Sequence, residues 1–279
     1  MPFDRAARER DYSPSSVIGG DYAPFLERYR TASAAALRTL AVQRDLRYGD
    51  ASRAVLDYFP PPTWAGRPGL LVYFHGGYWQ ELSKADSAFL APAWHAAGFA
   101  HAVAGYSLAP AAPLPEIVDE CRAAVAWLHA RADSLGFDAS RIVLAGSSAG
   151  AYLAAACADG QGPPIRGLVP VSGIYDVAPL IGTTVNDALG LDEATAAAMD
   201  LLTTARRFCP AVVAWGDIET AAFKRQSRAF AARLAAEGVP CTPLEVPGRN
   251  HFDVVLDLGD PSSALFAAAH ALFTAGASA

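Results

Sequence analysis

The sequence carries little positive charge and contains no long apolar run. Of its 279 residues, 22 are Lys or Arg and 28 are Asp or Glu, which gives a formal net charge of −6. No basic stretch supplies the positive face that nucleic-acid-binding domains use. No apolar run reaches the roughly 18 residues that a membrane-spanning helix needs. We therefore expect neither a nucleic acid nor a membrane as a partner.

Cysteine is also scarce, and its spacing excludes two kinds of site. Cys121, Cys157, Cys209 and Cys241 form no C-x-x-C pair, so neither a zinc site nor a redox motif is indicated. We expect buried free thiols in a reducing compartment. The first eleven residues are mostly charged and do not resemble a signal peptide, which favours a cytoplasmic location.

What the sequence does have is a regular alternation of apolar runs and helical patterns. This alternation predicts an α/β fold with a mostly parallel central sheet covered by helices on both faces. Residues 44–48 and 53–59 flank Gly49-Asp50 and predict a hairpin before it. We expect residues 1–279 to form a single domain. The apolar runs are 70–74, 99–104, 142–145, 168–171, 211–215 and 242–246, and the helical stretches are about 85–97, 116–135, 149–158, 224–237 and 261–274.

One connection, residues 174–208, is unusually long and shows little regular pattern beyond an alanine-rich stretch at 193–199. Connections of this length are usually functional. With the N-terminal helix predicted over residues 25–40, it could form a small cap over a site. The alternative is that it only decorates the surface.

The sequence Gly-Ser-Ser-Ala-Gly at residues 146–150 lies between an apolar run and a helical pattern. It fits G-x-S-x-G, the turn that lifts a nucleophilic serine out of a strand and onto the start of a helix. The central residue, Ser148, is the predicted nucleophile, and Ser147 occupies the variable position. The backbone N–H of Ala149 is then a predicted oxyanion donor.

A second segment, His-Gly-Gly-Tyr-Trp at residues 75–79, also follows an apolar run. It fits the HGG-type loop that supplies further N–H groups to an oxyanion, here most plausibly those of Gly77 and Tyr78. Tyr78 and Trp79 add aromatic surface near the predicted pocket. We expect His75 to hold the loop rather than to act as a base.

Of the six histidines, His251 stands out because it lies in a polar loop between a late strand and the last helix. It is the predicted general base. The acid should follow the strand at 211–215, where Asp217 and Glu219 are both candidates and spacing does not separate them. Asp253 is a poorer choice, because residues two apart rarely meet in that geometry. The order Ser, acid, His is the order of α/β-hydrolases and predicts a serine hydrolase.

Together these motifs resemble the kynurenine formamidase (arylformamidase) family of the α/β-hydrolases, which is related to the hormone-sensitive-lipase-like esterases. His75-Gly76-Gly77-Tyr78-Trp79 looks like that family's H-G-G-x-W signature, and the resemblance covers about residues 12–256. Further segments that look like those of the family are 12–15, 106–110, 172–176, 179–180, 186–187, 223–227 and 251–253.

The resemblance implies Ser148 as nucleophile, His251 as base and Glu219 as acid, because Glu219 stands four residues before the F-x-R-Q-S segment that begins at Phe223. It implies cleavage of N-formyl-L-kynurenine to L-kynurenine and formate in tryptophan degradation, without a metal or organic cofactor. Dimers occur in that family, so a homodimer is compatible with it. The candidates to stack on the aryl group of this small-molecule substrate are Tyr78, Trp79 and Tyr175.

The sequence departs from the family pattern at two places. Ser147 stands where members usually carry His, and residues 218–222 lack the Ser-Pro-Glu that commonly follows the acid. Two other functions compete with the formamidase. One is a carboxylesterase acting on short-acyl aryl esters, because the same triad serves both reactions. The other is a non-catalytic binding protein on a hydrolase fold.

Overall fold

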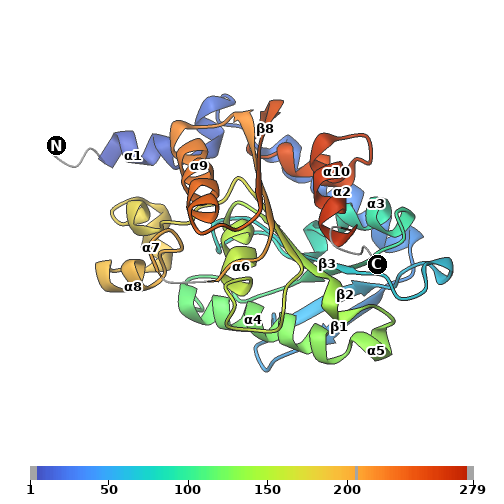
Figure 1. The fold of residues 1–279 in the computed structure, drawn as a ribbon. Coiled ribbons are helices and arrows are strands. Elements are labelled where there is room, and N and C mark those ends of the chain that lie inside the picture. Colours follow the sequence, from blue (N-terminus) through green and yellow to red (C-terminus); the bar gives the residue numbers. More distant parts are fainter. Residues whose placement is uncertain (1–4, 205–206, 275–279) are drawn as a thin grey trace.

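The computed structural model describes residues 5–204 and 207–274, and its centre is one eight-stranded sheet (Figure 1). The strand order is β1-β2-β4-β3-β5-β6-β7-β8. The first two strands form the predicted hairpin, β2 pairs antiparallel with β4, and every other pairing is parallel. The strands are β1 (Gln43–Arg47), β2 (Val55–Phe59), β3 (Leu70–Phe74), β4 (Ala100–Ala104), β5 (Ile142–Ser147), β6 (Gly167–Val171), β7 (Ala211–Ile218) and β8 (Cys241–Asn250).

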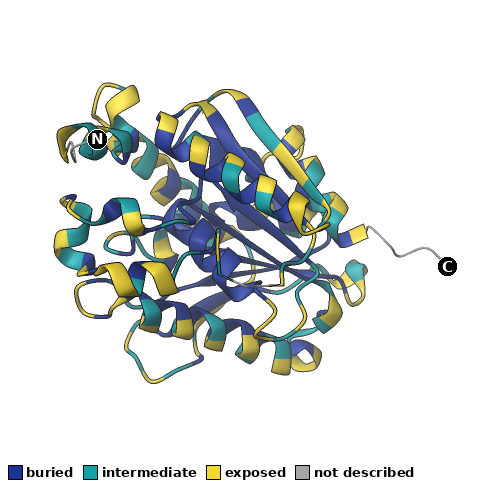
Figure 2. Ribbon diagram, turned by 60° about the vertical axis from the view of Figure 1, so that its left-hand side comes forward, coloured by how far each residue is buried: buried dark blue, intermediate teal, exposed yellow. Residues whose placement is uncertain are grey.

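The four central strands β4, β3, β5 and β6 are buried along their whole length (Figure 2). Each is an almost unbroken apolar run, which is what a parallel strand needs when helices cover both of its faces. The expected mostly parallel α/β sheet is therefore confirmed.

Two apolar cores lie on the two faces of this sheet. One core includes side chains of α4 (Leu114–Ala130), α6 (Ala149–Cys157) and α9 (Ala221–Ala236). The other includes side chains of α2 (Ala23–Thr39), α3 (Ala91–Ala96) and α10 (Ala264–Thr274). The remaining helices are short: α1 (Arg5–Asp11), α5 (Ala132–Leu135), α7 (Val185–Leu189) and α8 (Glu193–Ala198), with 3₁₀ turns at Pro14–Val17, Thr63–Ala65, Lys84–Asp86, Ala88–Leu90, Ala139–Arg141, Ala178–Leu180 and Val254–Gly259.

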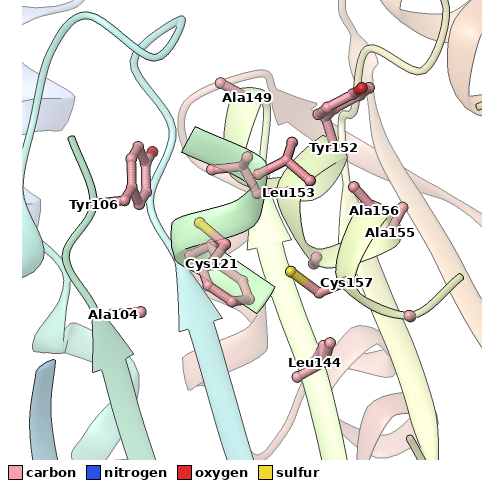
Figure 3. Packing of buried hydrophobic residues seen from close by; sticks show 14 of the residues in the cluster. Ala104, Tyr106, Cys121, Leu144, Ala149, Tyr152, Leu153, Ala155, Ala156 and Cys157 are labelled. Carbon is pink, nitrogen blue, oxygen red and sulfur yellow. The ribbon is translucent and has the colours of Figure 1, made fainter. Parts of the chain in front are cut away.

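Helix α6 is buried on every side, which explains its composition of small residues. A methyl group built on Gly150 would stand 2.1 Å from the carbonyl oxygen of Phe74, so the helix approaches β3 as closely as a glycine allows. Figure 3 shows Cys121 of α4 and Cys157 of α6 among the apolar side chains of this region. Both thiols are free and buried, while Cys209 and Cys241 are free and partly exposed.

Two helical predictions and one long connection differ in detail from the structure. The stretch predicted near 85–97 begins as two 3₁₀ turns and becomes α-helical only at Ala91. The stretch predicted over 116–135 is divided at Arg131 into α4 and α5. The connection 174–208 contains the turn at Ala178–Leu180 and helices α7 and α8. No helix in the described part of the chain combines the length and apolarity needed to cross a membrane.

Candidate active site

Ser148 stands at a sharp turn between β5 and α6. Its backbone has φ 55° and ψ −120°, a conformation that a residue with a side chain adopts only under strain. Its N–H donates to the carbonyl of Val171 on the neighbouring strand at 2.8 Å, which fixes the turn to the sheet. A methyl group on Gly146 would stand 2.1 Å from the carbonyl oxygen of Gly150. Gly146 is therefore required by the backbone of Gly150, and Gly150 by the backbone of β3.

The loop after β3 lies beside this turn. Gly77 and Tyr78 both have positive φ, at 96° and 50°, and the Gly77 carbonyl accepts hydrogen bonds from the N–H groups of Gln80 and Glu81. Ala149 is the first residue of α6, so its N–H has no acceptor within the helix. In the described part of the chain, no backbone carbonyl accepts from the N–H groups of Gly77, Tyr78 or Ala149. These are the groups that an oxyanion would need.

Side chains on both sides hold this loop in place. The Tyr78 hydroxyl donates to the backbone carbonyl of Tyr12. Tyr12 belongs to residues 5–22, which precede α2 and are called the N-terminal segment below. The Tyr106 hydroxyl donates to the carbonyl of His75 at 2.6 Å, and its ring stacks on the His75 imidazole at 4.1 Å. Burial lowers the pKa of His75 to about 4, so this imidazole is neutral near neutral pH. It is a buried structural group of the loop.

His251 follows β8 and lies against Glu219, which follows β7. The distance from His251 Nδ1 to Glu219 Oε2 is 3.1 Å. The other carboxylate oxygen of Glu219 accepts from Ser172 Oγ at 2.5 Å and from the Gly216 N–H at 2.6 Å. The ring of Phe223 meets the imidazole edge-on at 4.3 Å. Since Nδ1–H donates to the carboxylate, Nε2 is left unprotonated in the neutral ring.

The two candidate acids that spacing left open lie in different surroundings. Glu219 is buried and hydrogen-bonded to His251, whereas the side chain of Asp217 is exposed to solvent. Asp253 accepts from the backbone N–H of Asn250 at 2.7 Å and makes no contact of this kind with His251. Ser172, the donor to Glu219, was not predicted as a site residue, although it lies in one of the segments resembling the family.

Ser148 and His251 line the same cavity, whose volume is about 330 Å³. Its outer wall is the N-terminal segment, with Thr184 and Val185 from the long connection. The predicted cap is thus built mainly by residues before the N-terminal helix and by one short part of 174–208. The lining residues are Glu9, Tyr12, Ser13, Pro14, Ser15, Tyr22, Leu26, Tyr29, Gly76, Gly77, Tyr78, Gln80, Glu81, Leu82, Ser147, Ser148, Thr184, Val185, His251 and Phe252.

The prediction that Trp79 and Tyr175 stack on a substrate is wrong in this structure. Both side chains are completely buried and neither lines the cavity. Trp79 packs edge-on against Tyr152 at 5.5 Å, and Tyr175 stacks on Phe230 at 4.1 Å. Both are core residues and do not face the cavity. Tyr78 does line the cavity.

The aromatic surface of the cavity comes mostly from residues that were not predicted as site residues. Tyr12, Tyr22, Tyr29 and Phe252 all contribute to its lining. Tyr22 stacks on Phe252 with ring centroids 5.2 Å apart. Only Tyr12 and Phe252 had a signal in the sequence, because both lie in segments that resemble the family.

The N-terminal segment is attached to the core by a set of long-range hydrogen bonds. The buried amide of Gln226 donates to the Tyr12 hydroxyl at 3.1 Å and to the Asp176 carbonyl at 2.8 Å. Its oxygen accepts from the N–H groups of Tyr175 and Asp176, each at 3.0 Å. The Thr220 hydroxyl donates to the Asp11 carbonyl at 2.5 Å. This outer wall is therefore connected directly to residues next to Glu219 and to the oxyanion loop.

Comparison with known proteins agrees with this architecture. A family model described as the alpha/beta hydrolase fold matches residues 71–254. A crystal structure from Silicibacter sp. tm1040, of a protein named provisionally as a thioesterase, has a TM-score of 0.81 and 30% identity and covers 96% of this chain and 98% of that one. An esterase of the archaeon Pyrobaculum calidifontis has a TM-score of 0.73 at 19% identity, covering 98% and 99% of the two chains, and shares the fold. The protein is a serine hydrolase of the α/β-hydrolase class.

The particular family follows from a curated relative. The kynurenine formamidase of Danio rerio is 32% identical over 228 residues, which cover 77% of this chain and 76% of that protein. This chain belongs to the kynurenine formamidase family.

Proposed function

We propose that the protein hydrolyses the formamide of N-formyl-L-kynurenine to L-kynurenine and formate. The observation that carries the proposal is the coincidence, in one cavity, of Ser148 and His251 with a relationship to kynurenine formamidases over three quarters of the chain. Ser148, His251 and Glu219 form the proposed triad.

In the proposed cycle His251 Nε2 takes the proton of Ser148, and Ser148 Oγ attacks the formyl carbon. The N–H groups of Gly77, Tyr78 and Ala149 bind the resulting oxyanion. Protonated His251, stabilised by Glu219, then gives its proton to the aniline nitrogen, which leaves as the aryl amine. Water, activated by the same imidazole, releases formate from the formyl-serine.

The dimensions and lining of the cavity support an aryl formamide. A volume of about 330 Å³ lies at the small end of the range for small-molecule sites, which suits one aromatic ring and a short acyl group. Aromatic side chains line it on several sides, and such rings pack well against a planar aryl group. Formyl is the smallest acyl group, so the close approach of the glycine loop to Ser148 leaves sufficient room for it.

A second candidate is the hydrolysis of short-acyl aryl esters. It is favoured by the 30% identity to the Silicibacter protein named provisionally as a thioesterase, because ester and formamide cleavage use the same acyl-serine step. An ester is the easier substrate chemically, so activity toward one would not by itself define the enzyme.

The test is the ratio of kcat/KM for N-formyl-L-kynurenine to kcat/KM for p-nitrophenyl acetate, measured on the same purified protein. The proposal predicts a ratio well above one, despite the greater intrinsic reactivity of the ester. Ester cleavage without detectable formamide turnover would leave the hydrolase class intact and overturn the proposed substrate.

A further inference from the structure

Beside the nucleophile lies a second serine hydroxyl that the proposed reaction does not use. Ser147 lines the cavity, although only 9% of its surface is exposed. A methyl group built on Gly76 would stand 3.3 Å from Ser148 Cβ and 3.5 Å from Ser147 Oγ. Both serine side chains therefore approach the same point of the glycine loop. Ser147 thus directly precedes the nucleophile and lines the same cavity.

The orientation of the Ser147 hydroxyl follows from its partner. Tyr73 Oη and Ser147 Oγ are 2.8 Å apart, and either could be the donor on distance alone. Burial raises the pKa of Tyr73, which therefore keeps its proton and has to donate it. Among the described residues, Ser147 Oγ is the one acceptor in hydrogen-bond range of the Tyr73 hydroxyl. Tyr73 is thus the donor, because the reverse arrangement would leave a buried phenol proton unpaired.

If Tyr73 donates, the proton of Ser147 is left over. No other side chain or carbonyl in the described ranges accepts it, and Ser147 lines the cavity, where an acceptor of a bound ligand can reach it. A ligand acceptor placed there makes a hydrogen bond to a hydroxyl that Tyr73 already holds in position. The cavity therefore offers a hydrogen-bond donor, the Ser147 hydroxyl, to a second acceptor on a substrate bound at Ser148.

We infer that Ser147 donates a hydrogen bond to a carbonyl group of the substrate placed ortho to the formamide nitrogen, and that Tyr73 positions Ser147 for this contact. The inference rests on the proposed formamidase function and narrows it to ortho-acyl aryl formamides. Ser147 is then a specificity-determining residue, and Tyr73 is a positioning residue that does not touch the substrate. In N-formyl-L-kynurenine the ketone of the side chain occupies this ortho position.

The test compares two model substrates, 2′-formamidoacetophenone, which carries the ortho ketone, and formanilide, which lacks it. The measured quantity is the ratio of their kcat/KM values for each enzyme variant. Dividing the ratio of a variant by that of the unaltered enzyme removes the intrinsic difference in reactivity between the substrates. Ser147→Ala is expected to lower the ratio about tenfold, mainly through KM for the ketone substrate, while formanilide turnover changes little.

Tyr73→Phe separates positioning from folding. It leaves Ser147 in place but removes its donor, so the ratio should fall by a smaller factor, about threefold. The matched control is Tyr58→Phe, which removes another buried tyrosine hydroxyl, bonded to the Leu135 carbonyl at 2.7 Å and outside the cavity lining. Tyr58→Phe should lose stability and keep the ratio.

Three results would overturn the inference. One is an unchanged kcat/KM for both substrates in Ser147→Ala, and another is an equal fall for both, which would leave their ratio unchanged and mean that Ser147 serves the nucleophile. In either case, continued formamide turnover by the unaltered enzyme would leave the proposed function standing. No turnover of either formamide by the unaltered enzyme would overturn the proposed function together with the inference.

Discussion

The two halves of the cavity wall are built in different ways. The inner half carries Ser148 and His251 directly after β5 and β8, with Glu219 after β7 bonded to His251, so the sheet sets their separations. The outer half is the N-terminal segment, which reaches the site through hydrogen bonds to residues about 60 to 210 positions away, such as Tyr78 and Gln226. The ends of the strands thus position the proposed catalytic residues, whereas long-range hydrogen bonds position the outer wall that would enclose the substrate. Substitutions in the two halves should therefore differ in how strongly they lower kcat.

The largest effect should come from the inner half. Ser148→Ala removes the proposed nucleophile and is expected to lower kcat by about 10⁴- to 10⁶-fold, while the free energy of unfolding stays nearly constant. Steady-state turnover of N-formyl-L-kynurenine together with urea unfolding measures both quantities. Turnover near the unaltered rate would contradict the mechanism.

The next largest effect concerns the acid. Glu219→Ala should reduce kcat by about 10³- to 10⁴-fold, because His251 loses the partner that orients it and stabilises its charged form. Asp217→Ala is the matched control, since its carboxylate is two residues away and exposed. It should keep activity within about threefold of the unaltered enzyme, as surface substitutions usually do. The reverse order of the two variants would assign the acid to Asp217.

A smaller effect is expected at the contact between the two halves. Tyr78→Phe removes the hydroxyl that donates to the Tyr12 carbonyl and so loosens the oxyanion loop. We expect kcat to fall about 3- to 10-fold, because an oxyanion donor that moves stabilises the transition state less well. Tyr58→Phe again serves as control. If Tyr78→Phe changed stability but not kcat, the outer half would have no part in positioning the loop.

The last effect is on stability rather than on turnover, and it depends on pH. Burial lowers the pKa of His75 to about 4 and that of His101 to about 3, from an ordinary 6.5. Below pH 6.5 the unfolded chain binds protons that the folded chain excludes, so stability is complete above this pH and falls as the pH approaches 4. The slope is on the order of 1 kcal/mol per pH unit for each histidine.

Urea unfolding at pH 7, 6 and 5 measures that slope. His101→Leu removes one of the two groups at a site outside the cavity, and it should make the dependence shallower. An identical slope in the variant would show that His101 does not contribute.

The residues proposed for the inner half have a clear signal in the sequence and most of those in the outer half do not, for a physical reason. Ser148 and His251 lie at strand–helix junctions, and such junctions are visible as a change from apolar runs to turn residues and helical periodicity. Spacing alone did not separate Asp217 from Glu219, because the choice depends on which side chain turns into the sheet edge. In the structure Glu219 does so and Asp217 does not.

The aromatic residues of the site show most clearly what the sequence could not predict. Trp79 and Tyr175 follow strands near the site and were expected in the cavity, yet both are buried in the core. Tyr22 and Tyr29 lie about 120 residues from Ser148 and were not selected, yet both line the cavity. Which face of a loop an aromatic ring occupies is decided by tertiary packing, which local pattern does not encode.

The most direct test of the central claim is fluorophosphonate labelling mapped by mass spectrometry, with and without N-formyl-L-kynurenine as competitor. We expect one label, on Ser148, that forms more slowly when the formamide occupies the cavity and is absent in Ser148→Ala. Labelling of another residue, or labelling of Ser148 that the formamide does not slow, would contradict it.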